Sequence, residues 1–140
     1  MANWYGTARS NYFQVNDEQA FLERCKILGL EAHSQGGDAE TPKAFMVHPN
    51  NSEDGSWPQF IDELATEENE DGEVNIGEEI QKFLLPGSVA ILGCVGAEKL
   101  RYLTADVVIV TTDGVEYRNL FEEVYAELLD DGLNATRMEY

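Results

Sequence analysis

The sequence predicts an α+β fold: a two-layer sandwich with a mainly antiparallel sheet and about three helices. Three observations lead to this class. Segments with strand-like patterns alternate with amphipathic helical segments along the 140 residues. The connections between them are short, which favours antiparallel pairing with the helices on one face of the sheet. The first elements follow a βαββαβ order, so we expect a partly ferredoxin-like arrangement in one domain over residues 1–140.

The first predicted elements are a strand and a helix. Ser10–Val15 alternates apolar and polar side chains, which is typical of a strand with one buried face. Asn16 and Gln19 have the spacing of a capping box at a helix start, and Gly29 can end the helix. Between them, apolar residues recur at helical spacing: Phe21, Leu22, Cys25 and Leu28.

Two short strands and two loops are predicted next. Residues 30–34 and 44–48 have the composition of strands, and the segment between them is rich in glycine, acidic residues and proline. Pro49–Pro58 reads as the clearest loop in the chain. Residues 59–65 can form a short helical turn.

The second half is predicted to begin with a helix and to continue with strands. Asn75 and Glu78 repeat the capping-box spacing before a helical apolar face. That face consists of Ile76, Ile80, Phe83 and Leu84. Ser88–Val95 has the composition of a buried strand. Residues 100–112 are predicted to form one long strand, or two strands broken near Asp106.

A hairpin and a terminal strand are also expected. Asp113-Gly114 is a hairpin turn signal, so residues 115–119 are predicted to pair back onto the preceding strand. Residues 134–140 can add a final strand.

Between the hairpin and that strand lies the pattern of a last helix. Asn119 and Glu122 give a third capping-box spacing, and the helix is expected to end near Gly132. Its apolar stripe consists of Leu120, Phe121, Val124, Tyr125 and Leu128.

The charge of the chain is its most unusual property. There are 27 acidic residues against nine basic ones, a net charge of −18. This excess argues against direct binding to nucleic acid or an anionic membrane, which require lysines and arginines. A basic protein surface, such as that of a nucleic-acid-binding protein, is the natural partner. The alternative is that the charge serves only solubility.

The cysteines and the N-terminus indicate a compartment. The first residues lack a basic segment followed by an apolar one, so no signal peptide is predicted. Cys25 and Cys94 lie in apolar segments and are interpreted as reduced core thiols. We therefore expect a cytoplasmic protein.

Two segments concentrate the acidic residues. Residues 62–79 carry nine acids and no base, and residues 122–131 carry five acids and no base. Glu123, Glu127 and Asp131 recur every four residues, about 6 Å apart along a helix axis. Such a row can imitate a nucleic-acid backbone, although a solvated helix face has the same pattern. The predicted partner-binding residues are Asp62, Glu63, Glu67, Glu68, Glu70, Asp71, Glu73, Glu123, Glu127, Asp131 and, as an exposed aromatic, Trp57.

A calcium loop is a weaker alternative for residues 67–78. Gly72 would be the turn glycine of an EF-hand-like loop. The ligands would be Glu67, Asn69, Asp71 and Glu78. The first ligand is Glu where the pattern requires Asp, and the sequence has no second loop of this kind. No metal site is therefore predicted, and the calcium loop stays an alternative.

No catalytic residue or cofactor is predicted, and the protein is expected not to be an enzyme. His33 and His48 are the only histidines, without metal-ligand spacing, and each is more typical of a structural or surface residue. Asn3–Gly6 places two aromatic residues at the terminus, where they cap the core or form a contact patch. Lys99 and Arg101 are interpreted as an ion-pair hub for nearby acids.

The segments "MANWYGTARSNYFQV", "GAEKLRYL" and "TRMEY" resemble those of small acidic accessory proteins carried by phages, plasmids and other mobile elements. This resemblance implies no catalytic residue. It implies a context in which DNA-mimic inhibitors of host defence, such as antirestriction or anti-CRISPR proteins, are similar in character. The leading hypothesis is such an acidic binding protein. The alternative is an immunity protein or antitoxin that neutralises a basic toxin.

Overall fold

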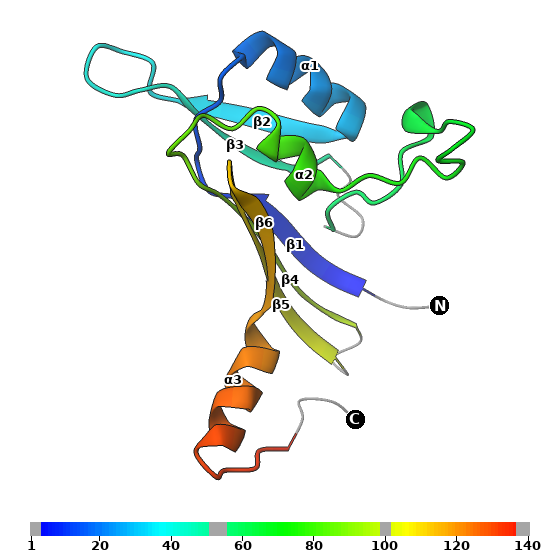
Figure 1. Cartoon of the computed structure of the whole chain (residues 1–140), viewed down its shortest axis with the longest axis vertical. Coiled ribbons are helices and arrows are strands. Elements are labelled where there is room, and N and C mark those ends of the chain that lie inside the picture. Colours follow the sequence, from blue (N-terminus) through cyan, green and yellow to red (C-terminus); the bar gives the residue numbers. More distant parts are fainter. Residues whose placement is uncertain (1–3, 51–55, 99–101, 137–140) are drawn as a thin grey trace.

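The computed structural model describes residues 4–50, 56–98 and 102–136. Its antiparallel sheets and its helices confirm the predicted α+β class (Figure 1). In chain order the elements are β1 (Trp4–Ser10), α1 (Glu18–Leu28), β2 (Leu30–Gln35), β3 (Ala44–Pro49), the 3-10 turn η1 (Asp62–Leu64), α2 (Ile76–Gln81), β4 (Ala90–Glu98), β5 (Tyr102–Thr111), β6 (Gly114–Asn119) and α3 (Leu120–Asp130).

The strands form two sheets. The larger sheet has the order β1-β4-β5-β6, and β2 pairs with β3 in a separate hairpin. All of these pairs are antiparallel. The βαββαβ order predicted from the sequence is therefore present along the chain from β1 to β4, but its strands are divided between two sheets.

The first strand lies earlier than predicted. The strand expected at Ser10–Val15 is wrong, because β1 ends at Ser10 and only isolated bridges follow. Beyond β1 the chain crosses from the large sheet to the hairpin. Phe13 exchanges two backbone hydrogen bonds with Phe45 of β3, at 2.9 and 2.8 Å, and the Ser10 hydroxyl accepts one from the Val47 amide at 2.9 Å. The apolar alternation reflects this crossing and not a continuous strand.

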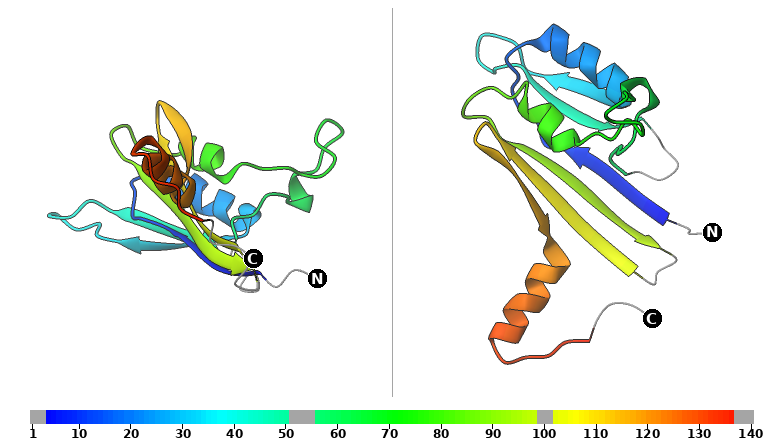
Figure 2. Two further views of the ribbon diagram at one scale, coloured as in Figure 1. Left: turned by 90° about the horizontal axis from the view of Figure 1, so that it is seen from below. Right: turned by 45° about the vertical axis from the view of Figure 1, so that its right-hand side comes forward.

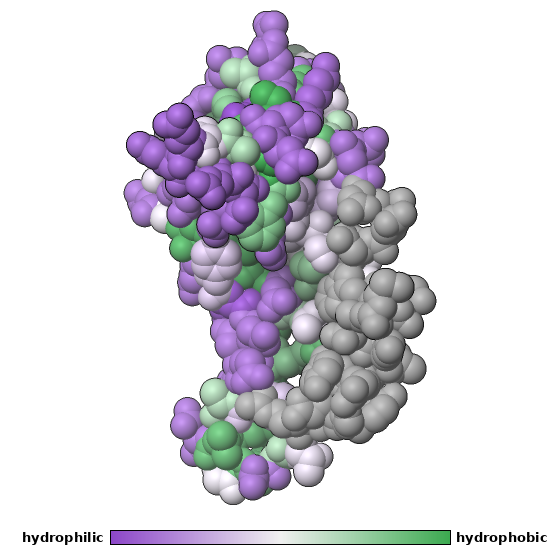
Figure 3. Space-filling model, turned by 90° about the vertical axis from the view of Figure 1, so that its right-hand side faces the viewer, coloured by the Kyte–Doolittle hydropathy of each residue, from purple (hydrophilic) through white to green (hydrophobic). Residues whose placement is uncertain are grey.

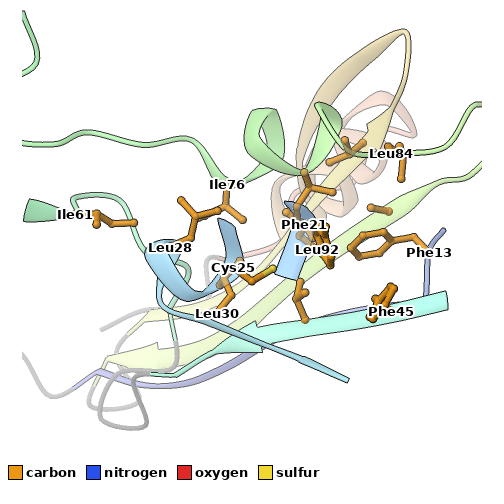
Figure 4. Packing of buried hydrophobic residues seen from close by; sticks show 14 residues of the cluster. Phe13, Phe21, Cys25, Leu28, Leu30, Phe45, Ile61, Ile76, Leu84 and Leu92 are labelled. Atoms are coloured by element: carbon orange, nitrogen blue, oxygen red, sulfur yellow. The ribbon is translucent and has the colours of Figure 1, made fainter. Parts of the chain in front are cut away.

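The core lies where α1, α2 and the hairpin meet one end of the large sheet (Figure 4). Phe21 is central to it, with ring centroids 5.6–5.8 Å from those of Phe13, Phe45 and Phe83. Leu92 and Val110 contribute from the sheet and are almost completely buried. Burying each such side chain stabilises the fold by about 1.5–3 kcal/mol before the entropy cost of ordering it.

The helix starts follow the predicted chemistry, with one shift. Asn75 and Asn119 cap α2 and α3, and their side chains accept from the amides of Glu78 and Glu122. The cap of α1 is Asp17, which accepts from the Ala20 amide, so the assignment to Asn16 is wrong by one residue. A carboxylate at this position also interacts favourably with the helix dipole.

The second half of the sheet is more regular than predicted. β5 continues without a break because Asp106 pairs with Cys94 on one side and Asn119 on the other. β4 alternates in burial, with Ala90 and Leu92 buried and Ile91 exposed, so the expected fully buried strand is wrong.

The connections at the end of the chain also differ. The turn between β5 and β6 is formed by Thr112 and Asp113, since Gly114 already pairs with Thr111. Of the predicted final strand, residues 134–136 are in no strand, and residues 137–140 lie outside the described part.

The last helix stands apart from the other two. α3 continues from β6 beyond the end of the large sheet that is remote from α1 and α2 (Figures 1 and 2). It contacts β5 and β6. The prediction that the helices share one face of the sheet therefore fails for α3. In the described part of the chain, no helix combines the length and the apolar character needed to cross a membrane.

Candidate functional site

The acidic segment 62–79 is mostly an ordered loop. The Asn69 side chain accepts from the Glu73 amide at 3.0 Å and donates to the Glu73 carbonyl at 2.8 Å. Thr66 binds Asn69 through two further hydrogen bonds. A loop closed by its own side chains holds its remaining residues in fixed positions.

This loop is attached to the core at Gly72. Gly72 is buried with φ +67°, and a Cβ there would lie 1.9 Å from the Ile61 carbonyl oxygen. The Ile61 amide donates to the Gly72 carbonyl at 2.9 Å. Only glycine permits this approach and this backbone conformation together. The predicted binding residues of this segment are all exposed: Asp62, Glu63, Glu67, Glu68, Glu70, Asp71 and Glu73.

The same geometry disfavours the calcium alternative. Both polar atoms of the Asn69 amide are used within the loop. Glu67, Asp71 and Glu78 are not brought together, since among the described residues the carboxylates, histidines and cysteines that converge as a group of three or more are on the β2–β3 hairpin. The loop also follows a 3-10 turn and not a helix.

Glu79 is the exception in this acidic segment, because it is buried. Its carboxylate accepts from Arg24 at 2.5 Å and from Lys82 at 3.0 Å, with 6% of its side chain exposed. Burial alone raises the pKa of Glu79, but the hydrogen bonds and charges of Arg24 and Lys82 outweigh it and lower that pKa below its usual value. Glu79 is thus a structural ion pair and not a recognition residue.

The row on α3 is only partly free. Glu123 is half-buried and binds Arg118 at 2.7–2.8 Å, and the hydrogen bond and charge of Glu123 raise the pKa of Arg118. Glu127 and Asp131 are exposed one turn apart. Two of the three predicted residues of this row are therefore presented to solvent.

The two acidic segments lie at different ends of the molecule. The loop is beside α2, whereas α3 is beyond the far end of the sheet (Figures 1 and 2). They do not form one continuous strip of negative charge. Each is a separate candidate contact area.

The apolar stripe of α3 is only partly covered. Phe121, Tyr125 and Leu128 are half-buried, whereas Val124 is 52% exposed. Outside the stripe, Leu129 and Leu133 expose 61% and 57% of their surface. Hydrophobic side chains gather at this end of the molecule, while hydrophilic ones dominate the opposite end (Figure 3). An amphipathic helix with an exposed apolar side is a feature of protein-binding surfaces.

The outer face of the sheet adds apolar surface. Ile91 and Val95 of β4 are 41% and 50% exposed, and Leu103 of β5 lies on the same face by register. Antiparallel sheets commonly have one face in solvent, and apolar side chains gathered on such a face are a feature of interaction surfaces.

Trp57 is half-buried against the sheet, so the prediction of an exposed aromatic at this position is wrong. Its indole nitrogen donates to the Gly93 carbonyl at 3.2 Å, and its ring packs against the core. It also lines a cleft of about 460 Å³ that contains Cys94, Asp106 and Tyr117. The residues that line this cleft in the described part include no histidine, lysine or arginine, and Asp106 is the acidic one among them.

The cysteines and the basic turn complete the predicted candidates. Neither cysteine is part of a disulfide in the described part of the chain. Cys25 is buried, which raises its pKa to about 12, and Cys94 is half-buried. Such a pKa keeps Cys25 a neutral thiol at physiological pH, which makes it a poor nucleophile. Lys99 and Arg101 lie outside the described residues, as does Asn3 of the terminal aromatic segment, whose other residues begin β1.

Sequence reasoning missed one cluster. His33 and His48 are 15 residues apart, yet the hairpin places their ring nitrogens 2.9 Å apart with Glu31 beside them. The only available signal was strand alternation, which puts Glu31 and His33 on one face of β2. The position of His48 depended on the hairpin register.

Comparison with known proteins gives no relative: no family model, no curated protein and no solved structure matches the chain.

Proposed function

We propose that this protein is a non-enzymatic acidic binding protein that docks on a basic surface of another protein through α3. The observation that carries the proposal is the exposed apolar surface of α3 beside exposed carboxylates. Val124 and Leu129 are more than half exposed, and Glu127 and the C-cap residue Asp131 are exposed too. Interfaces commonly have an apolar centre with a polar rim.

The net charge of −18 supports a basic partner. Opposite charge steers two proteins together and raises the rate of association, with a strong dependence on salt. The partner class proposed first is a nucleic-acid-binding defence protein, with the acidic residues acting as a DNA mimic in the service of a mobile element. Glu127 and Asp131 would then occupy positions that phosphates take in the natural complex.

The second candidate is an immunity protein or antitoxin that neutralises one basic toxin. The apolar stripe favours it, because a nucleic-acid backbone presents no comparable apolar surface. Added nucleic acid distinguishes the two candidates. It should displace a DNA mimic from its target, but it should not displace this protein from a toxin that is bound outside any nucleic-acid groove.

The test is capture of partners from a lysate of the organism that carries the gene, with the tagged full chain, elution by a salt gradient and identification by mass spectrometry. Two charge-neutral variants serve as a matched pair: Glu127→Gln/Asp131→Asn on α3 and Glu68→Gln/Glu70→Gln on the loop. We expect one basic protein to be retained by the wild type and the loop variant and to be lost from the α3 variant. Equal retention by both variants would contradict docking through α3. Retention that does not depend on salt would contradict a contact driven by charge.

A further inference from the structure

The β2–β3 hairpin brings three metal-ligating side chains to one exposed face. Glu31 is directly opposite His48 in the antiparallel register, and His33 is two residues along β2 on the same side. Their nearest ligand atoms all lie within 4.8 Å of one another. This cluster lies outside α3 and both acidic segments, so it is independent of the proposed function.

Two of the three separations match those between ligands of one ion. The Nε2 atoms of His33 and His48 are 2.9 Å apart, and His48 Nε2 is 3.2 Å from Glu31 Oε2. With metal–ligand bonds of 2.0–2.1 Å, adjacent ligand atoms lie ~2.9 Å apart at an octahedral centre and ~3.3 Å apart at a tetrahedral one. Both observed separations fall within this range.

Hydrogen bonding prepares His48 to act as a ligand. Its Nδ1 is 3.0 Å from the Pro49 carbonyl oxygen, which can only accept, so Nδ1 carries the proton. In the neutral ring this leaves the lone pair on Nε2, the atom that faces His33 and Glu31. A backbone carbonyl behind a ligating histidine is the usual arrangement that fixes its tautomer.

The cluster also brings acceptor atoms together at one point. The Glu31 carboxylate and the His48 Nε2 lone pair are both acceptors, and they face each other at 3.2 Å. A cation between them relieves this repulsion, and a metal ion can accept all three ligands together.

We propose that Glu31, His33 and His48 form a binding site for a divalent transition-metal ion of the zinc type. Two imidazoles and one carboxylate are a ligand set that Zn²⁺ commonly takes, and hard ions such as Mg²⁺ and Ca²⁺ prefer all-oxygen sites. The Glu31 and His48 side chains are 58% and 31% exposed. At least one coordination position is therefore open to water or to a ligand from another molecule.

The test is titration of the ¹⁵N-labelled full chain with ZnCl₂ alone, observed at the histidine ring nitrogens. Coordination moves the Nε2 resonances of both rings and saturates near one equivalent, while Nδ1 of His48 keeps its proton. Calorimetry measures affinity for His33→Gln and for the matched control Glu68→Gln. Loss of an outer-shell partner costs 10–100-fold in affinity, so we expect loss of the ligand His33 to cost at least about 100-fold. Glu68→Gln is expected to bind as the wild type does.

Two results would overturn the site. Ring resonances that do not move with Zn²⁺ would leave the pair as a simple histidine–histidine hydrogen bond. Equal affinity of wild type and His33→Gln would place bound zinc on other carboxylates. Excess Mg²⁺ in all titrations suppresses such diffuse binding, and circular dichroism confirms that the variants are folded.

Discussion

At the scale of single residues, the acidic loop depends on two residues that carry no charge. Asn69 satisfies the Glu73 backbone with both ends of its amide, and Gly72 lets the loop pass against the Ile61 carbonyl. The carboxylates around them contribute no such contacts to the loop's closure. Their exposure follows from how these two residues hold the backbone.

Glu79 allows a prediction with a defined pH dependence. Glu79→Gln leaves Arg24 without its carboxylate, and we expect a loss of about 2–3 kcal/mol in the free energy of unfolding at pH 7. The pKa of Glu79 is lowered in the folded state, so its contribution is complete above the unfolded value near 4.5 and is lost as the pH falls through the lower folded value. Urea unfolding at pH 7 and at pH 3 should therefore show a smaller difference between variant and wild type at the lower pH.

The neighbouring acid provides the control for this measurement. Glu78→Gln changes an exposed side chain in the first turn of α2, where only the helix dipole is involved, and should cost less than about 1 kcal/mol. A loss for Glu78→Gln as large as that for Glu79→Gln would mean that general charge, and not the Arg24 ion pair, determines the effect.

At the scale of elements, α3 is expected to be dispensable for stability and necessary for binding. The double variant Val124→Gln/Leu129→Gln changes side chains that are more than half exposed, so the free energy of unfolding should change by no more than about 0.5 kcal/mol per site. The same variant should lose the captured partner. Ile80→Ala on α2, in the core, should instead cost about 2–4 kcal/mol.

The stability of the α3 double variant also tests whether the apolar side chains of α3 are exposed in the free protein. Denaturant unfolding of wild type and variant is measured at two protein concentrations. A loss above about 2 kcal/mol for the double variant, or a midpoint that rises with concentration, would mean that a second copy covers the stripe.

Local patterns in the sequence were sufficient for most elements and insufficient for their placement. The asparagine caps of α2 and α3 and the β5–β6 hairpin depend on contacts a few residues apart, so their signals are in the sequence. β1 was missed because "WYGTARS" mixes glycine, alanine and polar residues and becomes a strand only by pairing with β4. For α3, the apolar stripe predicted a helix, but it did not predict which surface of the protein the helix would contact.

For the candidate sites, too, local features could be predicted from the sequence, whereas features that depend on contacts between distant residues could not. Exposure of the acidic loop residues follows from their chemistry, and the sequence was enough to predict it. The half-buried position of Glu123 depends on its contact with Arg118, which the sequence pattern did not predict. The approach of His33 to His48 depends on the hairpin register, which no spacing rule encodes.

At the scale of the whole molecule, the charge should affect folding and binding in opposite directions. With 27 acids and nine bases, most carboxylates lack an opposite charge, and their mutual repulsion destabilises the compact state. Raising NaCl from 0.01 to 1 M shortens the screening length from about 30 to about 3 Å. A gain of about 1 kcal/mol is then expected, which raises Tm by roughly 3–5 °C for a domain of this size. Differential scanning calorimetry measures this rise in Tm, and NaCl and KCl should give the same value because both salts screen charge equally.

The same increase in salt should weaken capture of a basic partner, because the attraction between the two proteins is screened along with the repulsion within this one. Along one salt series, the stability of this protein should therefore rise while its affinity for the partner falls. If Tm stayed constant while binding weakened, the repulsion within the fold would be too small to matter and the charge would act on the partner alone. If Tm rose while binding was unaffected, the contact would rest on the apolar stripe of α3, and the acidic residues would serve solubility.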